Sequence, residues 1–476
     1  YKANDGTVDS NIATVSININ PVNDAPTVID IDAGEVQINQ SIEIALQGSD
    51  IDNDNLTYSI VSQPTKGSVS INGAIATFSS TSLGEDTFVY QASDGIAESN
   101  EGTVAIKITN WRKTYGGSDN DYAYSVIQTS DEGYLLVGET SSFGNGSSDV
   151  YLVKTDAEGI EEWSQTLGGS GIDSGRSVIQ TSDGGYLFGG YTDSFGDGSY
   201  DMYLVKTDGS GTEEWSKTYG GTGNDYAYSL IQTSDGGYLL GGWSRIVGNG
   251  SADMYIVKTD ANGTEEWSQA FGGTVMDGVK SVIQTSDGGY LLGGFSDSFG
   301  NGNDSMYIVK TNASGTKEWS QTYGGSDGDY VNSVLQTSDG GYLLAGETRS
   351  FGNGSSDMYL VKIDGSGTEE WSQTFGGAKI DLARSVIQTS DGGYLLAGLT
   401  GSFGNGYGDI YVIKTDASGT QESSKTFGGG ASSNRANSVI QTSDGGYIIG
   451  GVTSSFGNGK NDMYLVKTDV NWNKEW

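Results

Sequence analysis

Apolar and polar residues alternate along much of the chain with a period of two, the pattern of half-buried β-strands. Val104, Ile106 and Ile108 alternate with residues of the opposite face, and the Asp-Gly pair at 94–95 supplies a turn before them. Clusters of Gly, Asn, Asp and Ser separate four short strands predicted further along, at 176–181, 186–190, 201–207 and 213–219. The 76 glycines, 28 tyrosines and only 3 prolines also favour short strands and tight turns over long helices. The chain is therefore predicted to be all-β.

The first kind of repeat in the chain has an offset of 89 residues. Residues 1–19 align without a gap with residues 90–108 and share ten identities, the Asp-Gly turn among them. Residues 1–20 are therefore predicted to be the tail of a preceding domain of the same type as residues 21–110. An Ig-type β-sandwich is the natural fold for about 90 residues with this pattern.

The second kind of repeat has a period of 52 residues. A tryptophan recurs once per unit, at Trp111, Trp163, Trp215, Trp267, Trp319, Trp371 and Trp476. Ser423 occupies the tryptophan position of one unit, and one extra residue precedes Trp476. Each of seven units also carries Gln-Thr-Ser-Asp-Gly-Gly-Tyr or a near copy. A period near 50 with four strands and a recurrent tryptophan is typical of propeller blades, each of which needs a neighbour on both faces. Residues 111–476 are therefore predicted to form a seven-bladed β-propeller of four-stranded blades.

The spacing of the repeat also predicts how the ring closes. Each unit's fourth strand begins near its tryptophan, and the sequence stops at Trp476, where an eighth such strand would start. Because only the strand at 111–115 is complete, we expect it to pair with the strand around Tyr464 to Lys467. The seventh blade then takes one strand from the front and three from the back, which leaves no exposed edge at the seam.

Composition excludes several classes of function. Without histidine or cysteine, the chain cannot carry a Ser-His-Asp triad, a cysteine nucleophile, a zinc finger or an iron–sulfur cluster. Sixty-one acidic and 24 basic residues give a net charge of −37, which repels nucleic acid and anionic lipid and attracts hard cations such as calcium. No run of about 20 apolar residues is present, so no direct membrane insertion of this segment is expected.

Acidic residues cluster at the start of the sandwich domain, with Asn-Asp-Ala-Pro at 23–26 and Asp-Ile-Asp-Asn-Asp at 50–54. In combination they resemble the cadherin-like tandem domains of large prokaryotic surface proteins, whose linkers carry Asn-Asp-x-Pro and whose next domain supplies Asp-x-Asp. In that family calcium ions lie between successive domains and stiffen the rod. The resemblance therefore implies a Ca²⁺ site with the ligands Asn23, Asp24, Asp50, Asp52 and Asp54. The alternative is a solvated turn, although three carboxylates repel one another without a cation.

The blade segments resemble those of bacterial and archaeal surface propellers. The stretch at 206–215 is also similar to the Trp-docking repeat of quinoprotein dehydrogenases, but the vicinal cysteines that many of them stack on the quinone are absent. Thr-Ser-Asp-Gly-Gly at 181–185 matches the start of the Asp-box of sialidase-type propellers without its final aromatic residue, and a hairpin turn explains it. These likenesses imply a shared framework and no cofactor site in the propeller.

A residue present in every blade is most simply part of the framework, whereas a single site must break the sevenfold pattern. An aspartate recurs at one position of six blades and is replaced by Asn434 in the seventh: Asp121, Asp173, Asp225, Asp277, Asp329 and Asp381. These residues either surround the central channel and attract cations or bind backbone amides in their own turns. Trp243 and Arg245 replace the usual Thr-x-Ser-Phe loop. Because exposed aromatic rings stack on sugars, Trp243, Arg245 and Tyr191 are the candidate ligand-binding residues. None of the breaks assembles an acid, a base and a nucleophile.

These features predict a binding role and no enzymatic activity. We expect a segment of a large prokaryotic protein, secreted or at the cell surface, in which a calcium-stiffened stalk of sandwich domains presents the propeller for adhesion or surface assembly. Its partners would be other surface proteins or glycans and neighbouring domains of the same chain, and not nucleic acid. The alternative is a carbohydrate-binding propeller of a secreted polysaccharide-degrading system.

Overall fold

The chain divides into two compact units, residues 1–111 and 112–476, in a computed structural model that describes residues 1–18, 22–37, 41–82, 84–109, 113–301, 304–429 and 432–476. All 37 elements among these residues are β-strands, so the all-β prediction is confirmed. The predicted domain boundaries after residues 20 and 110, and Trp111 of the closing strand, lie outside the described residues.

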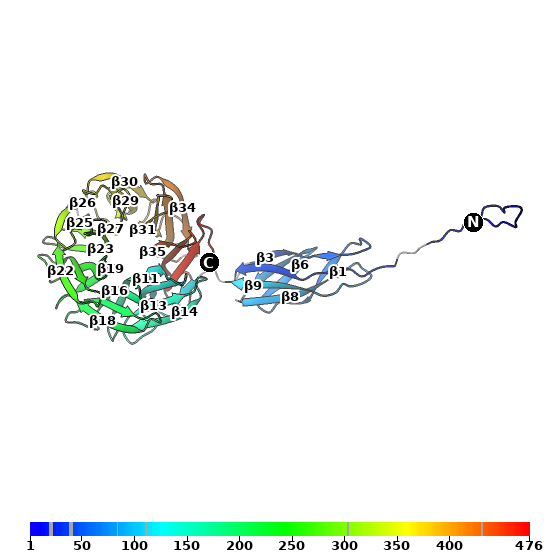
Figure 1. Cartoon of the computed structure of the whole chain (residues 1–476), viewed down its shortest axis with the longest axis horizontal. Coiled ribbons are helices and arrows are strands. Elements are labelled where there is room, and N and C mark those ends of the chain that lie inside the picture. Colours follow the sequence, from blue (N-terminus) through cyan, green and yellow to red (C-terminus); the bar gives the residue numbers. More distant parts are fainter. Residues whose placement is uncertain (19–21, 38–40, 83, 110–112, 302–303, 430–431) are drawn as a thin grey trace. The chain divides into compact units, whose positions relative to one another are not determined.

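The first unit contains a β-sandwich of two main sheets (Figure 1). Its strands are β1 (Thr27–Val28), β2 (Ile31–Gln37), β3 (Ser41–Ala45), β4 (Gly48–Ser49), β5 (Thr57–Ser62), β6 (Gly67–Asn72), β7 (Ile75–Ser80), β8 (Gly84–Ser93) and β9 (Gly102–Thr109). One sheet has the order β2-β9-β8-β5 with β2 parallel to β9, the other has the order β3-β7-β6, and β1 pairs with β4. The Ig-like sandwich predicted for this part of the chain is thus present.

Alternating residues of the central strands build the sandwich core. The three apolar positions of β9 that alternate in sequence are all buried: Val104, Ile106 and Ile108. Tyr90 of β8 is buried among them, and its hydroxyl lies 2.8 Å from the carbonyl oxygen of Ile29 and 2.9 Å from that of Gln47. A buried tyrosine that keeps a hydrogen-bond partner contributes its full apolar surface without an unsatisfied hydroxyl.

Residues 1–13 form the same turn as residues 90–102, 89 positions later. In each turn the aspartate of the Asp-Gly pair, Asp5 or Asp94, accepts the backbone amides two and three residues further on. An isolated bridge closes each turn, between Asn4 and Asp9 and between Ser93 and Glu98. The sequence repeat is therefore also a repeat of local hydrogen bonds.

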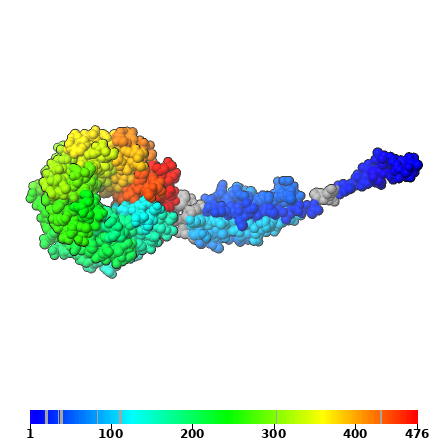
Figure 2. Space-filling view, in the orientation of Figure 1, coloured from blue at the N-terminus to red at the C-terminus, as the bar shows by residue number. Residues whose placement is uncertain are grey.

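The second unit is a ring of seven four-stranded antiparallel sheets, which confirms the predicted propeller (Figure 1). The innermost strands contact one another around the ring: β11 (Asp121–Gln128), β15 (Asp173–Gln180), β19 (Asp225–Gln232), β23 (Asp277–Gln284), β27 (Asp329–Gln336), β31 (Asp381–Gln388) and β35 (Asn434–Gln441). The second strands are β12 (Tyr134–Thr140), β16 (Tyr186–Thr192), β20 (Tyr238–Ser244), β24 (Tyr290–Ser296), β28 (Tyr342–Thr348), β32 (Tyr394–Thr400) and β36 (Tyr447–Thr453). A hollow lies at the centre of the ring (Figure 2).

The outer half of each blade consists of a buried third strand and an exposed fourth. The third strands are β13 (Asp149–Thr155), β17 (Asp201–Thr207), β21 (Asp253–Thr259), β25 (Ser305–Thr311), β29 (Asp357–Ile363), β33 (Asp409–Thr415) and β37 (Asp462–Thr468). The fourth strands are β14 (Glu161–Leu167), β18 (Glu213–Tyr219), β22 (Glu265–Phe271), β26 (Lys317–Tyr323), β30 (Glu369–Phe375), β34 (Gln421–Phe427) and, from the front of the unit, β10 (Lys113–Tyr115). In β17 all seven residues are buried, because both faces of the strand pack against other blades.

The lysine of each third strand is buried but not isolated. The Lys206 ammonium group lies 3.0 Å from a carboxylate oxygen of Asp183 and 2.8 Å from one of Glu214. Asp183 belongs to the hairpin turn at 181–185, where it also accepts the amide of Gly185, so the predicted turn is present. Equivalent triads join the turn to the third and fourth strands in the other blades. A buried charge needs such compensation to be tolerated.

The innermost strand begins earlier than the sequence indicates. In the second blade β15 starts at Asp173, not at Arg176, because the register with β16 shifts between Gly175 and Ser177. This β-bulge leaves Arg176 unpaired and interrupts the alternation on which the prediction rested. The same shift occurs in all seven innermost strands.

The ring closes as predicted, with an addition from the last residues of the sequence. Strand β10 pairs antiparallel with β37, with Tyr115 opposite Met463. At the other end of β37, the amide of Lys467 donates to the carbonyl oxygen of Trp476 (2.9 Å). The fourth strand of the seventh blade is thus composite, because 113–115 and the final residues pair with different parts of β37.

Two tryptophans, Trp472 and Trp476, also complete the packing between blades. In the other blades a fourth-strand tryptophan packs on a tyrosine of the next blade, as Trp163 does on Tyr186 with ring centroids 6.1 Å apart. Ser423 lacks such a ring, and Trp472 instead stacks on Tyr447 at 4.5 Å. Trp476 packs in the same way on a tyrosine of the first blade, Tyr134, at 5.8 Å. The terminal segment therefore supplies both missing contacts.

Candidate functional sites

Three carboxylates converge in the loop between β4 and β5. One oxygen each of Asp50, Asp52 and Asp54 lies within 4.8 Å of the others. The Oδ1 atom of Asp50 accepts the backbone amide of Asp52 (2.8 Å), while its Oδ2 atom is buried without a hydrogen-bond partner among the described residues. Asn53 holds the loop in the left-handed region at φ 64°. The fold thus brings three of the four predicted acidic ligands together.

The other two predicted ligands lie beside this loop and are held differently. The backbone amide of Asp24 donates to Oδ2 of Asp52 (2.9 Å), which ties the domain junction to the acidic loop. The side-chain amide of Asn23 donates to Oδ2 of Asp94 (2.8 Å) in the turn after β8. Backbone amides and Asn23 lower the pKa of Asp94. Asp94 was missed as a neighbour of the site, although its match with Asp5 at the 89-residue offset marked it as a recurrent residue.

The candidate ligand-binding residues of the propeller meet around one further tyrosine. Tyr226 of β19 lies with its ring centroid 4.8 Å from that of Tyr191 and 4.3 Å from that of Trp243. Tyr200 packs on the same ring at 5.1 Å. Trp243 is only 7% exposed, whereas Arg245 is exposed and its guanidinium lies 5.8 Å from the Trp243 ring. We call Tyr191, Tyr200, Tyr226 and Trp243 the aromatic wall.

The recurrent aspartates bind backbone amides in their own turns, the second of the two interpretations considered. Asp173 is fully buried at the start of β15, where its carboxylate accepts the amide of Gly169 (2.8 Å) and the hydroxyl of Ser194 (2.7 Å). The amide bond recurs in the other blades that carry the aspartate, and the serine bond in all of these except the third, where Ile246 replaces the serine; Oδ1 of Asp173, Asp225, Asp277, Asp329 and Asp381 is buried without a hydrogen-bond partner among the described residues. These residues therefore belong to the framework.

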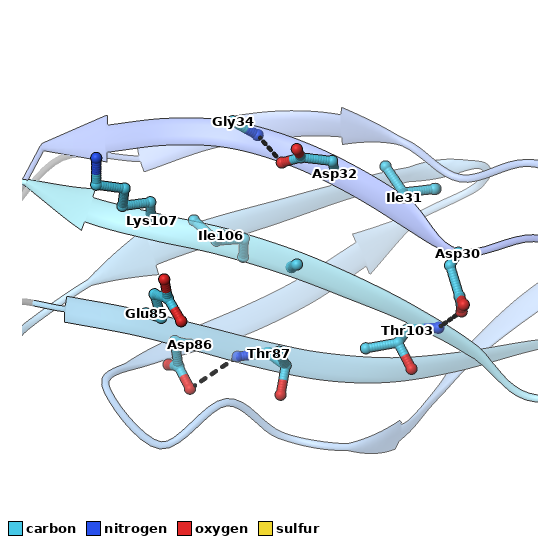
Figure 3. Close-up of a pocket in the computed structure, with 11 residues that line it drawn as sticks. Asp30, Ile31, Asp32, Gly34, Glu85, Asp86, Thr87, Thr103, Ile106 and Lys107 are labelled. Atoms are coloured by element: carbon cyan, nitrogen blue, oxygen red, sulfur yellow. Dashed lines mark hydrogen bonds between the residues drawn. The ribbon is translucent and has the colours of Figure 1, made fainter.

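The sandwich carries a cavity of about 790 Å³ on the sheet formed by β2, β9 and β8 (Figure 3). Asp30, Asp32, Glu85 and Asp86 line it (Figure 3). Three of these carboxylates accept backbone amides: Asp30 from Thr103, Asp32 from Gly34, and Asp86 from Thr65, Lys66 and Thr87. These carboxylates fasten strand ends, and we assign them no ligand.

Comparisons with known proteins agree with the architecture. Residues 23–107 match the family described as Bacterial Ig domain. A curated relative, Regulatory protein FlaEY of Caulobacter vibrioides, is 28% identical over 209 residues, which are 38% of this chain and 22% of that protein. The chain thus spans about a fifth of that relative's length.

Solved structures that resemble the chain do so at low sequence identity. Sqt1 from Chaetomium thermophilum (TM-score 0.44, 12% identity) covers 76% of this chain and is itself covered to 85%. A puromycin hydrolase (TM-score 0.45, 12% identity) covers 75% and is covered to 53%. An auxiliary nutrient binding protein from Bacteroides ovatus (TM-score 0.35, 11% identity) covers 94% and is covered to 99%. At these values we draw no functional argument from them.

The match to the bacterial Ig family, together with the propeller, fits a surface protein. Within the described residues, no helix is long and apolar enough to cross a membrane.

Proposed function

We propose that the chain is a segment of a prokaryotic surface or secreted protein in which a calcium-stiffened stalk presents the propeller for adhesion or surface assembly. The observation that carries the proposal is the convergence of Asp50, Asp52 and Asp54 beside the backbone of Asp24. Residues 1–13, which repeat the turn of the sandwich domain, support a tandem arrangement in which 1–20 end a preceding domain. The junction between tandem domains would then lie next to the acidic loop.

The donor set of this loop suits a hard cation. Calcium takes six to eight oxygen ligands, and the loop offers carboxylates that have few other partners. Asp50, Asp52 and Asp54 would hold the ion, and Asp24 would add its carboxylate from the junction. Asn23 donates its amide nitrogen to Asp94, so its side-chain oxygen is the atom that would turn to the ion. A bound ion would offset the mutual repulsion of the carboxylates and fix the junction.

The propeller is proposed to act by binding and not by catalysis. One oxygen of each recurrent innermost-strand aspartate accepts a backbone amide, and the acidic residues of the turn and fourth strand pair with the buried lysine, as in the second blade. The binding partners of the chain would be other surface proteins or glycans, and neighbouring domains of the same chain. The alternative, a carbohydrate-binding propeller of a secreted polysaccharide-degrading system, is favoured by the aromatic wall, whose partly exposed Tyr191, Tyr200 and Tyr226 offer rings to a sugar.

Calcium titration of the full chain by isothermal calorimetry tests the proposal. We expect a saturable heat that Asp52→Asn and Asp54→Asn abolish or weaken about tenfold or more, because each removes one charged ligand. Asp32→Asn is the matched control, since Asp32 lies outside the loop in the cavity of Figure 3. No saturable binding, or equal loss in the control, contradicts the calcium site. A glycan array with the full chain and with Tyr226→Ala separates the alternative, which predicts bound glycans that the variant loses.

A further inference from the structure

The β-bulges leave one residue per blade out of the strand pairing in the innermost strands, which surround the centre of the ring. These seven residues, which we call the bulge ring, are Tyr124, Arg176, Tyr228, Lys280, Asn332, Arg384 and Asn437. All of them are partly buried. A bulge commonly re-aims a side chain out of the regular pleat, and bulges gather at the rims of barrels and next to functional sites.

Side chains of the bulge ring contact one another from blade to blade. The Arg176 guanidinium carbon lies 3.6 Å from the ring centroid of Tyr124 and 6.0 Å from that of Tyr228. The Lys280 ammonium nitrogen lies 3.8 Å from the same Tyr228 ring centroid. Four consecutive blades therefore form a series of alternating aromatic rings and cations, and the strands that bear them surround the centre of the ring (Figure 1).

The bulge ring carries more positive charge than its neighbours neutralise. Arg176 lies 3.5 Å from Glu139 and donates to the Tyr191 hydroxyl (2.6 Å). By contrast, neither Lys280 nor Arg384 has a carboxylate within salt-bridge distance or a hydrogen bond among the described residues. Glu347 acts on Arg384 through its charge only; burial raises the pKa of Glu347, and one of its carboxylate oxygens is buried without a hydrogen-bond partner among the described residues.

The other groups near Lys280 disfavour its positive charge further. Besides the rings of Tyr228 and Phe295, the charged groups near it are the guanidinium groups of Arg176 and Arg384. Burial, and then these two cations, lower the pKa of Lys280 to about 8. A cluster of cations of this kind stands out in a chain whose net charge is −37.

The framework does not need these cations. In two blades the bulge residue is asparagine, and its amide donates to the backbone carbonyl next to the following bulge: Asn332 to Ala383 (2.8 Å) and Asn437 to Ala123 (2.7 Å). That arrangement satisfies the backbone without any charge. Cations at three equivalent positions break the sevenfold pattern and leave donors unpaired, which is the sign of a functional site and not of the scaffold.

We propose that the cations of the bulge ring, above all Lys280 and Arg384, bind the oxyanion group of a small ligand, a carboxylate, sulfate or phosphate. The arginine presents a planar fork that matches an oxyanion, and the lysine adds a point charge. This site goes beyond the proposed function, since Lys280 and Arg384 belong neither to the calcium loop nor to the aromatic wall, although Tyr191 of the wall accepts a hydrogen bond from Arg176. A free inorganic ion and the acid group of a sugar share the required chemistry, so the test separates them.

The test is calorimetric titration of the full chain at pH 7 and constant ionic strength with sodium sulfate, sodium glucuronate and neutral glucose. We expect saturable binding of one or both anions and none of glucose. Lys280→Met and Arg384→Met should each weaken binding about tenfold or more. Lys217→Met, which removes an exposed lysine of β18, is the matched control and should leave the affinity unchanged. Tighter binding of glucuronate identifies a sugar acid as the ligand class, and equal binding identifies the oxyanion alone.

A second readout comes from pH. Because Lys280 loses its proton near pH 8, anion affinity of the native chain should fall as pH rises through 8, whereas Lys280→Arg should keep its affinity to higher pH. The proposal is overturned if neither anion binds saturably, or if Lys280→Met and Arg384→Met bind as tightly as the native chain. Either result leaves the calcium titration unaffected, so the two proposals fail independently.

Discussion

Replacing Lys280 by methionine should stabilise the propeller at neutral pH. Burial and two nearby guanidinium groups lower the pKa of Lys280 from 10.5 to about 8. At about 1.36 kcal/mol per pH unit, this difference corresponds to about 3 kcal/mol by which the charged lysine destabilises the folded state below pH 8. Methionine has a similar length, carries no charge and fits a largely apolar environment, so it should recover most of that free energy.

The gain in stability from Lys280→Met should decrease as pH rises. Between pH 8 and 10.5 the unfolded chain still holds the Lys280 proton while the folded chain has released it, so the native protein becomes more stable as pH rises. The advantage of Lys280→Met should therefore be constant below pH 8, shrink above it and vanish near pH 10.5. At about 2.1 cal/mol/K per residue, the 365 residues of the unit 112–476 convert about 3 kcal/mol into a rise in Tm of about 4 °C.

Differential scanning calorimetry of the full chain measures this effect, in a buffer without sulfate, phosphate or carboxylates. The control is Lys217→Met, which removes the same charge from the exposed surface and should change Tm by less than about 1 °C. A Lys280→Met variant that is no more stable than the native chain at pH 7 would refute the reasoning. So would a gain that persists undiminished at pH 10.5.

Three further outcomes follow from the packing of the blades. Trp472→Ala should destabilise the propeller by about 2 kcal/mol, seen as a lower urea midpoint, because the stacked contact with Tyr447 replaces the one lost at Ser423; Val470→Ala, an exposed neighbour, should have no effect. Tyr115→Phe should cost about 1 kcal/mol, since its hydroxyl donates to the carbonyl oxygen of Gly159 (2.8 Å) across the seam; an unchanged midpoint would contradict the closure. Hydrogen bonds within the turn and salt bridges to the buried lysines hold the pKa at about 2 for Asp183, Asp235, Asp287, Asp339, Asp391 and Asp444. Their stabilisation, complete above pH 3.8, should therefore be lost as pH falls through 2; acid unfolding monitored by tryptophan fluorescence that finishes above pH 4 would rule this out.

The blade architecture could be predicted from the sequence because each blade must present the same contacts to its neighbours. The recurrence of tryptophan, of the turn at 181–185 and of the third-strand lysine follows directly from that requirement. The sixth blade, with Ser423 in place of the tryptophan, and the seventh, with its composite fourth strand, depart from the repeat, and for these two blades the prediction was incomplete. Trp472 compensates for Ser423 from outside the 52-residue period, so counting positions could not reveal it.

The candidate sites were only partly predictable, for two physical reasons. Every blade has its β-bulge at the same place, so the bulge does not change the 52-residue period and cannot be recognised from it. The only sequence signal is that the bulge position varies from blade to blade between aromatic, cationic and amide residues: Tyr124, Arg176, Tyr228, Lys280, Asn332, Arg384 and Asn437. The second reason is that contacts across the fold cannot be read from local spacing. Neither the hydrogen bond from Asn23 to Asp94 nor the position of Tyr226 between Tyr191 and Trp243 has a local signal.

The most direct test of the central claim, a stalk stiffened by calcium, is the thermal unfolding of the full chain with calcium and with a chelator. The two compact units should unfold in separate transitions. Calcium at a hundredfold excess over its dissociation constant should stabilise the sandwich unit by about 2.7 kcal/mol and leave the propeller transition nearly unchanged. The Asp52→Asn variant should lose that response. Identical unfolding of the sandwich unit with calcium and with chelator would contradict the account.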